Sequence, residues 1–392
     1  CLLFQPQLIG AMKGSNEIME MWREIEDSDF HATENEVHPV PKIFTILSGA
    51  ELRNVSLPPK VNVLGDGAIS LGQTSTIIGQ GGTGKSRVVV QIAIFQVLGW
   101  SFAGLATHKD PLRHLLIGTE NTIYRQKSEY LKMTKALSPE QRAKVDSHIF
   151  FHVIENIDDA FIHLGSDDIK RRWLNTIEAI KPNCIYVDPF GEVNVGDINK
   201  DADVRHTLRE LTKVCRRFDP TTAIIIVHHG RTGRQNIAQA VGWDKGNFGL
   251  GSKALYSGAR SQINIAPADP DDTSMIVVSC GKSNDAKPFD PIGLKLNEET
   301  MLYDIDPSFD LNAWKDDVAG KRTNANFSIK EVAELIDKGK VKVSEIHSEL
   351  GGSGVGSKRS LERILAKGKK ESYFRASKGC YRLTEKGQKI LT

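Results

Sequence analysis

Long hydrophobic runs are missing from this sequence. No uninterrupted apolar stretch approaches the ~20 residues that a membrane-spanning helix needs. The longest candidate, 88–100, is interrupted by Gln91 and Gln96 and predicts a buried helix. The start, Cys1-Leu2-Leu3-Phe4, lacks the basic residues and the apolar core of a secretory signal. These absences argue against any membrane partner. Because position 1 is Cys rather than Met, we expect a fragment or a trimmed product.

Cysteine is scarce and its positions are scattered. None of the spacings between the five cysteines is that of a metal site or a redox pair, and the sequence has no internal repeat or long low-complexity tract. Such thiols suit a reducing compartment, so we expect a cytoplasmic protein. The positions are Cys1, Cys184, Cys215, Cys280 and Cys380.

Charge is nearly balanced overall but unevenly distributed. The sequence is 40% apolar and 26% charged, which is ordinary for a globular protein, and its net charge is only +2. Residues 321–392 hold 17 Lys and Arg against 8 Asp and Glu, whereas the rest of the chain has 34 against 41. A basic carboxyl-terminal module on a mildly acidic body indicates a nucleic-acid contact. A solvated basic surface is the alternative.

Short apolar strands alternate with longer helical segments over residues 59–312. This alternation predicts an α/β domain whose mostly parallel sheet is covered on both faces. A polar extension (1–58) precedes it, and a polar linker (313–326) and a separate module (327–392) follow it. The expected parallel strands are 75–78, 114–118, 149–152, 184–187, 223–227 and 261–265, with antiparallel edge strands at 274–279, 292–296 and 301–304.

A glycine-rich octapeptide fits the phosphate-binding pattern G-x-x-x-x-G-K-[ST] in full. It runs Gly79-Gln80-Gly81-Gly82-Thr83-Gly84-Lys85-Ser86, after the strand 75–78 and before a helical segment. Its backbone N–H groups and the amino terminus of the helix would surround the phosphates of ATP. Lys85 would reach the β- and γ-phosphates, and the Ser86 hydroxyl would ligate Mg²⁺. Arg87 completes the predicted ATP-binding segment.

Two further strands end in carboxylates. The apolar strand 184–187 is followed by Asp188, as a Walker B strand would be, so Asp188 is predicted to hold Mg²⁺ directly or through water. The strand 114–118 is followed by Thr119 and Glu120. Open parallel sheets place ligands at these strand ends, so Glu120 would orient or deprotonate the attacking water. A turn-forming Asp and an exposed helix cap are the structural alternatives.

The buried strand 223–227 ends in two adjacent histidines, His228 and His229. Neighbouring residues on a strand point to opposite faces, so at most one of them faces the nucleotide directly. We expect one histidine to sense the γ-phosphate and the other to be structural. A metal pair is not expected, because neighbours on a strand do not converge.

The order of these motifs resembles that of the RepA-type ATPases, RecA-like proteins best known as hexameric replicative DNA helicases of plasmids and phages. The resemblance spans roughly residues 60–300 and implies a ring that binds ATP between its subunits. It is carried by the phosphate loop, Thr119-Glu120-Asn121, Val187-Asp188-Pro189-Phe190, the polar loop 195–204 and Val227-His228-His229.

The segment 251–260 is similar to the Gly-Ser…Arg segment of this family. The resemblance implies that Arg260 is an arginine finger, which stabilises the transition state at the ATP of the neighbouring subunit. Lys282 would belong to the same contact. A surface or sheet-edge arginine is the alternative.

Asn121 departs from the family pattern, which often has Asp there, and the adenine contacts, for which Arg125 is one candidate, stay open. The polar loops 191–201 and 229–251 lie where RecA-like rings grip DNA in their central channel. Ordinary exposed loops would have the same composition. The basic residues expected to touch DNA phosphates are Arg231, Arg234 and Lys245.

The basic module has the signals of three helices and a hairpin. The helical spacing covers 327–336, 343–350 and 357–365, and the strands 372–375 and 380–383 flank a turn. This arrangement resembles a winged helix-turn-helix, a fold that binds DNA or docks proteins. The residues available to DNA on the third helix are Lys358, Arg359 and Arg363.

These features predict an ATP-dependent DNA helicase or translocase of the RepA type. It would act as a homo-hexameric ring on single-stranded or forked DNA, with ATP and Mg²⁺, in replication of a plasmid, phage or other mobile element. One alternative is a RecA-like ATPase that binds DNA without unwinding it and serves regulation or recombination. The other is a DNA-binding regulator whose assembly is switched by ATP.

Overall fold

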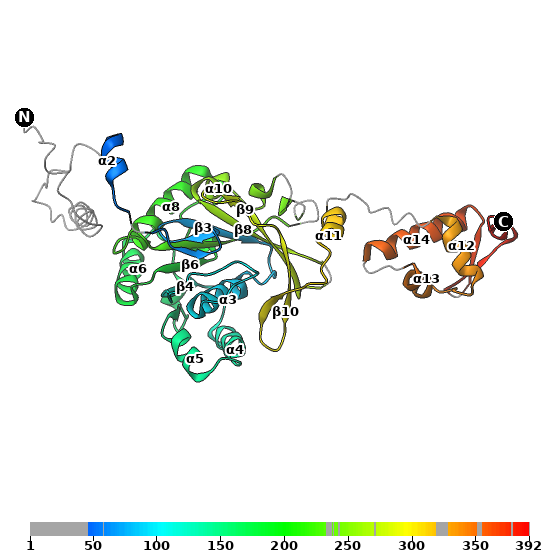
Figure 1. Cartoon of the computed structure of the whole chain (residues 1–392), viewed down its shortest axis with the longest axis horizontal. Coiled ribbons are helices and arrows are strands. Elements are labelled where there is room, and N and C mark those ends of the chain that lie inside the picture. The colour runs from blue at the N-terminus through cyan, green and yellow to red at the C-terminus, as the bar shows by residue number, and fades with distance from the viewer. Residues whose placement is uncertain are drawn as a thin grey trace, which may run out of the picture. The chain divides into compact units, whose positions relative to one another are not determined.

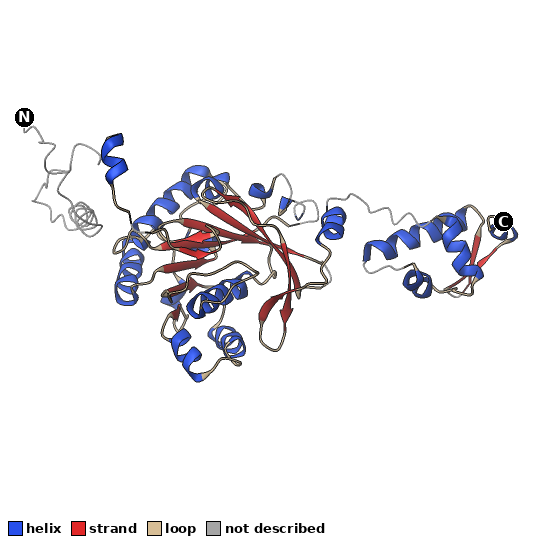
Figure 2. Cartoon of the chain, viewed as in Figure 1, coloured by secondary structure: helices blue, strands red, loops and turns tan. Residues whose placement is uncertain are grey.

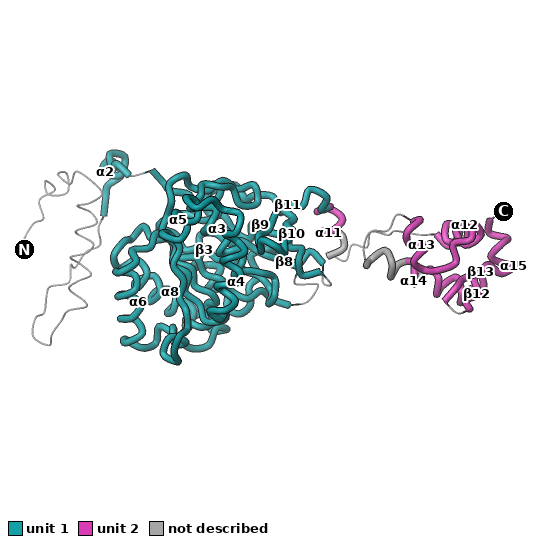
Figure 3. Tube along the Cα trace, turned by 90° about the horizontal axis from the view of Figure 1, so that it is seen from below, with its two compact units in different colours: residues 1–309 teal, residues 310–392 magenta. Residues whose placement is uncertain are grey.

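The computed structural model describes residues 46–57, 59–232, 237, 239–241, 244–269, 272–318, 328–350, 355–377 and 379–391. The side chains of 316–318, 355–360 and 363 lie outside the described part. The chain divides into two compact units, residues 1–309 and residues 310–392 (Figure 3). Each unit has a hydrophobic core of its own, so each is described by itself.

A nine-stranded sheet runs through the described part of the first unit (Figures 1 and 2). Its order is β11-β10-β9-β8-β3-β7-β6-β4-β5. The strands from β8 to β5 are parallel, and β9, β10 and β11 are antiparallel additions. The predicted α/β class and mostly parallel sheet are confirmed. The bounds are β3 (Thr74–Gly79), β4 (His114–Gly118), β5 (Ile149–Phe151), β6 (Cys184–Asp188), β7 (Ala223–His229), β8 (Ser261–Pro267), β9 (Met275–Ser283), β10 (Ile292–Asn297) and β11 (Leu302–Ile305).

Helices cover both faces of this sheet, as Figure 1 shows. On one face lie α3 (Lys85–Leu98), α4 (Ile123–Met133) and α5 (Pro139–Asp146). On the other lie α6 (Asp167–Ile180), α8 (Asp201–Cys215) and α10 (Lys253–Gly258). Among the described residues, no helix has the length and apolarity to cross a membrane. The shorter elements are α2 (Gly49–Asn54), β1 (Asn62–Leu64), β2 (Ile69–Ser70), η2 (Ile157–Ala160), α7 (Phe190–Val193) and η3 (Lys245–Asn247).

Helix α3 is the buried helix that the sequence predicts, and its two glutamines explain why an apolar run is interrupted. Both glutamine side chains are fully buried. Gln91 exchanges hydrogen bonds with the backbone of Tyr303 on β11, with N···O distances of 2.8 and 2.7 Å. Gln96 donates to the carbonyls of His108 (3.1 Å) and Asp110 (2.7 Å). The two amides therefore fix α3 against β11 and the segment before β4.

A second group of buried polar side chains fixes the loop between β7 and β8; we call it the amide clamp (the amides of Gln262 and Asn264 with the hydroxyl of Ser279). All three side chains are at most 2% exposed. Asn264 donates to the carbonyls of Ala240 (3.0 Å) and Lys245 (2.8 Å), Gln262 to Lys245 (3.1 Å), and Ser279 to Ala240 (2.6 Å). Because buried carbonyls need donors, the clamp defines where this part of the loop lies.

The second unit contains the predicted helices and hairpin. Among its described residues, a buried core includes Val332, Ile346 and Phe374. The helix α11 (Leu311–Val318) covers the beginning of the segment that the sequence predicts as a linker. The remaining elements are α12 (Ile329–Asp337), α13 (Val343–Glu349), α14 (Val355–Lys370), β12 (Phe374–Ser377), β13 (Cys380–Leu383) and α15 (Glu385–Gln388).

Removing the central amide of the clamp should destabilise the first unit. Asn264→Ala leaves the carbonyl oxygens of Lys245 and Ala240 with one hydrogen-bond donor each in place of two. It also removes most of a buried side chain. We expect a loss of about 1–3 kcal/mol in the free energy of unfolding, measured by urea denaturation. Asn54→Ala, at an exposed position of the same unit, is the control and should change stability by less than about 0.5 kcal/mol. Equal stability of the two variants would contradict the clamp.

Candidate active site

The phosphate loop joins the end of β3 to the start of α3. Two of its glycines adopt positive φ angles, +77° at Gly82 and +75° at Gly84, a backbone region that other residues rarely occupy. A Cβ atom at Gly84 would also collide with the hydroxyl of Tyr303. The loop thus needs glycine for its own turn and for the close approach of β11.

Lys85 is buried within this loop, with only 7% of its surface exposed. Its Nζ donates to the carbonyl oxygen of Gln80 across the loop, at 2.8 Å. Burial lowers the pKa of Lys85, and the carboxylates of Asp188 and Glu120 oppose this effect. A buried ammonium that lacks a direct carboxylate partner favours an added anion, and a phosphate has that charge.

Ser86 and Asp188 lie in contact at the end of β6. The Ser86 hydroxyl donates to Oδ2 of Asp188 at 2.5 Å, while Oδ1 is buried and has no hydrogen-bond partner among the residues that the structure describes. Burial raises the pKa of Asp188, and the negative charge of Glu120 raises it further. The hydrogen bond from Ser86 and the charge of Lys85 lower this pKa but do not cancel the increase. A buried free carboxylate oxygen beside a hydroxyl fits Mg²⁺, which prefers oxygen ligands and takes few from the protein.

No group of three or more His, Cys, Asp or Glu side chains in the described part of the chain forms a metal cluster. Mg²⁺ would therefore be held by Ser86 and Asp188 together with the phosphates. The bound ion would neutralise charge between the phosphate oxygens.

Glu120 and His229 meet at the same edge of the sheet. Nε2 of His229 and Oε1 of Glu120 are 3.2 Å apart, and both side chains are partly exposed (38% and 47%). The register explains the meeting, because Gly118 of β4 pairs with Asp188, and His229 pairs with Gly79 of the phosphate loop. A carboxylate here can act on a water molecule at the γ-phosphate.

The two histidines diverge, as strand alternation requires. His228 is 2% exposed, and burial lowers its pKa to about 4, so the ring is neutral. Its Nε2–H donates to the carbonyl of Leu250 at 2.9 Å, while the amide of Leu250 donates to the carbonyl of His229. His228 thus anchors the loop before α10, and His229 is the histidine that faces Glu120.

Arg87 points away from the phosphate loop toward α4. Its Nε and Nη2 donate to Oε1 of Glu129 at 3.0 and 2.9 Å, and Arg125 donates to the same oxygen at 3.1 Å. Burial by itself would lower the pKa of Arg87. The hydrogen bonds and charge of Glu129, together with Tyr303, outweigh burial, and the pKa of Arg87 is raised. The backbone of Arg87 lies in the first turn of α3, where helix N–H groups face a bound phosphate.

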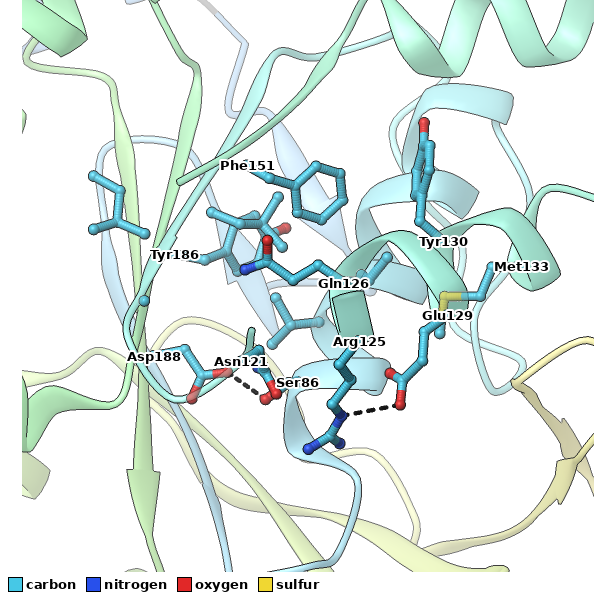
Figure 4. A pocket seen from close by; sticks show the side chains of 15 residues that line it. Ser86, Asn121, Arg125, Gln126, Glu129, Tyr130, Met133, Phe151, Tyr186 and Asp188 are labelled. Atoms are coloured by element: carbon cyan, nitrogen blue, oxygen red, sulfur yellow. Dashed lines mark hydrogen bonds and ion pairs between the residues drawn. The ribbon is translucent and has the colours of Figure 1, made fainter. Parts of the chain in front are cut away.

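A recess extends from Ser86 and Asp188 between α3, α4 and the strands β4, β5 and β6 (Figure 4). Its floor is apolar and includes Phe151 and Tyr186. Gln126 donates to the carbonyl of His152, and its buried side-chain oxygen has no hydrogen-bond partner in the described part of the chain. Because Ser86 and Asp188 belong to its lining, the recess continues the nucleotide site.

Sequence reasoning missed Glu129 and Tyr303. The Tyr303 hydroxyl is buried, lies against Gly84 and makes no hydrogen bond of normal geometry with a described residue; burial raises its pKa, and the nearby Arg87 opposes the shift. Tyr303 belongs to β11, at the antiparallel edge of the sheet, and lies about 220 residues after Gly84 in the sequence. No local sequence pattern encodes the strand order that brings the two residues together. Glu129 is signalled only by its i, i+4 spacing from Arg125.

Arg260 lies at the opposite edge of the sheet from the phosphate loop. Ser261 pairs with Ser75, and Ile265 pairs with Gly79, so Arg260 is about 16 Å from the loop along the strand direction. Its side chain is exposed, and its guanidinium makes no ion pair or hydrogen bond with a described residue.

Lys282, predicted beside Arg260, is engaged within its own chain. Its Nζ donates to the carbonyls of Tyr256 (2.8 Å) and Ala259 (2.7 Å) and lies 4.6 Å from the ring centre of Tyr256. Burial, followed by the nearby charge of Arg260, lowers its pKa. Lys282 therefore fixes the end of α10, which leads into Arg260.

The predicted DNA-contacting residues are only partly described. Arg231 donates from its backbone to Phe248 (2.9 Å) and from Nε to Gly249 (3.2 Å), and its carbonyl accepts from the Gln80 side chain (2.8 Å). It thus connects the phosphate loop with the loop before α10. Lys245 has its carbonyl in the amide clamp. Outside the described residues are Arg234 and the side chains of Lys358, Arg359 and Arg363.

The geometry is that of a P-loop nucleotide-binding domain with an α/β fold and a mostly parallel central sheet. Residues 46–235 match the family described as AAA domain. This segment contains the phosphate loop, Glu120, Asp188 and both histidines. P-loop ATPases of this kind use ATP and Mg²⁺.

Two solved structures are similar to this chain. One is the RadB recombinase, at 10% sequence identity and a TM-score of 0.40, covering 59% of this chain and 90% of that one. The other is a KaiC-like protein from the hyperthermophilic archaeon Pyrococcus horikoshii, at 12% identity and a TM-score of 0.39, covering 61% and 91%. No curated protein sequence matches this chain.

Glu120→Gln should reduce ATP hydrolysis while leaving nucleotide binding intact. The amide keeps the size of the side chain but does not accept a proton from water, so kcat should fall roughly 10²–10⁴-fold. Single-turnover hydrolysis and binding of a fluorescent ATP analogue measure the two properties. Glu140→Gln, an exposed carboxylate on α5, should hydrolyse ATP normally. An unchanged rate in Glu120→Gln would exclude Glu120 as the base.

Proposed function

We propose that this chain is an ATP-dependent DNA helicase or translocase of the RepA type. It forms a homo-hexameric ring, hydrolyses Mg-ATP between its subunits and acts on single-stranded or forked DNA. The biological setting we propose is replication of a plasmid, phage or other mobile element. The following paragraphs give the features of the molecule that support this function.

The observation that carries the proposal is the separation of Arg260 from the phosphate loop of its own chain. The distance of about 16 Å along β8 exceeds the length of an arginine side chain. An exposed arginine that has no described partner, held by the Lys282 contacts to Ala259, suits a site on another subunit. A head-to-tail interface that closes into a ring brings one edge of each subunit to the opposite edge of the next.

The residues at the phosphate loop then have distinct tasks. Lys85 binds the β- and γ-phosphate oxygens, and Ser86 and Asp188 hold Mg²⁺. Glu120 takes the proton of the attacking water, and His229, 3.2 Å from Glu120, responds to the γ-phosphate. Arg260 of the next subunit adds positive charge where negative charge develops in the transition state.

Contacts between the nucleotide site and the loops support coupling to DNA. Gln80 of the phosphate loop holds the carbonyl of Arg231, and Arg231 binds Gly249. His229 and Leu250 are joined through their backbones. A change at the γ-phosphate therefore has a short route to the loops 229–251, where we propose that Arg231, Arg234 and Lys245 contact DNA phosphates.

We also propose that the second unit is a winged-helix module. Three helices followed by the β12–β13 hairpin agree with that fold, and Lys358, Arg359 and Arg363 on α14 would contact DNA. Because this unit has its own core and carries the basic surplus of the chain, a DNA-binding regulator switched by ATP is the second candidate.

Hydrolysis measured with and without single-stranded DNA separates these functions. The wild type should hydrolyse ATP faster with oligo(dT) present. In Lys85→Ala, the hydrolysis rates with and without DNA should both fall roughly 10²–10³-fold, because one preorganised charged donor is lost. The control Lys135→Ala, at an exposed position, should keep both rates. Rates indifferent to DNA would contradict a motor and favour the ATP-switched regulator. A fully active Lys85→Ala would place hydrolysis elsewhere.

A further inference from the structure

Two exposed arginines of α8 lie on the same helical layer as Arg260. Arg205 and Arg209 are one helical turn apart. Helix α8 packs along α10 (Figure 1), and the side chain of Leu208 lies against Gly258 at the end of α10. Because Arg260 follows directly after α10, the three arginines belong to one layer of the first unit. We call Arg205, Arg209 and Arg260 the basic face.

The positive charge of the basic face is not neutralised within the described part of the chain. None of its three guanidinium groups makes a hydrogen bond or an ion pair with a described residue. Other cations near α8 do have partners: Lys170 binds Glu210 at 2.8 Å, and Lys213 binds the same carboxylate at 3.3 Å. Residues 1–320 have 41 Asp and Glu against 34 Lys and Arg, so the unit as a whole does not attract a polyanion such as DNA. The basic face therefore suits a local patch of negative charge.

The loop between β5 and α6 presents the opposite charge at the carboxyl edge of the sheet, where the nucleotide site lies. It begins at His152, whose Nδ1 is 2.8 Å from the carbonyl oxygen of Gly118 at the end of β4. Glu155 and Asp158 are exposed in this loop, and neither carboxylate has a partner among the residues that the structure describes. We call residues 155–161 the acidic loop.

The acidic loop also exposes two large apolar side chains, those of Ile157 (72%) and Phe161 (49%). Arg172 holds the loop, because it donates to the carbonyl of Asp158 at 2.6 Å and to Oδ1 of Asp159 at 2.7 Å. A loop that is already ordered loses little conformational entropy when it docks. Apolar side chains surrounded by charged ones have the composition of a protein interface, whereas the carboxylates would repel DNA phosphates. The partner of the acidic loop is therefore a protein surface with positive charge.

We propose that the acidic loop of one subunit docks on the basic face of the next subunit. The two surfaces have opposite charge and belong to the same chain, so a second copy supplies the partner of each. The acidic loop lies at the carboxyl edge of the sheet and Arg260 at the opposite edge, so the contact is head-to-tail and repeats around a ring. It also brings Arg260 of the next subunit to the edge that holds the phosphate loop. This inference rests on the proposed ring and does not depend on DNA or on unwinding.

Exchanging the charges of the two surfaces tests this contact. R205E/R209E makes the basic face negative, and E155R/D158R makes the acidic loop positive. Each variant alone places like charges opposite each other, so its self-association should weaken about 100-fold. Sedimentation of the full chain measures this, with Mg²⁺ and a non-hydrolysable ATP analogue and without DNA. An equal mixture of the two variants should assemble like the wild type, because each reversed surface then meets its complement.

The control K135E/K144E makes the same change of charge at exposed positions after α4 and on α5, and it should assemble like the wild type. Recovery in the mixture excludes unfolding as the cause of lost assembly, because unfolded chains would not complement each other. Normal assembly of either charge-reversed variant, an equal loss in the control, or a mixture that stays dissociated would overturn the inference.

Two further outcomes separate this inference from the proposed function. If R205E/R209E assembles normally but binds oligo(dT) more weakly, the basic face serves DNA and the contact between subunits is rejected while the motor is not. If the mixture recovers but DNA does not stimulate hydrolysis by the wild type, the motor fails and the inference stands. A wild type that stays monomeric rejects both the ring and the contact.

Discussion

The parallel alignment of β3, β4, β6 and β7 is the constraint on which the rest of the site depends. Parallel strands share one carboxyl edge, and the register of these four strands brings the phosphate loop, Glu120, Asp188 and His229 to that edge. Their side chains are buried on both faces of the sheet, as for Ile225 and Val187, so close packing against the covering helices holds this register. The chemistry is thus positioned by the core of the sheet.

The charges of Lys85 and Asp188 at this edge are only partly stabilised by the protein itself, so a charged ligand would stabilise both. Burial lowers the pKa of Lys85 and raises that of Asp188, so each charged form is disfavoured by burial and only partly supported by its neighbours. An anionic phosphate chain would stabilise the charge of Lys85, and a divalent cation would stabilise that of Asp188. His228, neutral with a pKa of about 4, adds no charge and serves to hold Leu250.

Much of the fold and of the phosphate-binding part of the site could be predicted from the sequence. Strand alternation and the glycine pattern are local signals, and each parallel strand that they predicted is present. The position of Tyr303 against Gly84 could not be predicted, because it depends on how three antiparallel strands bring β11 back to α3. The turn of Arg87 toward Glu129 likewise depends on packing between helices. Lys282 binds two carbonyls of its own chain, a contact that the sequence does not signal, and its contact with a neighbouring subunit stays a prediction.

The central claim is that one catalytic site contains residues of two subunits, and mixing two inactive variants tests it most directly. Lys85→Ala removes the phosphate-loop lysine, and Arg260→Ala removes the residue offered to the neighbour. We predict that each variant alone is inactive and that an equal mixture recovers up to about a quarter of the wild-type rate, because one interface in four then has both residues. A mixture no more active than its components, or a fully active Arg260→Ala, would contradict the shared site.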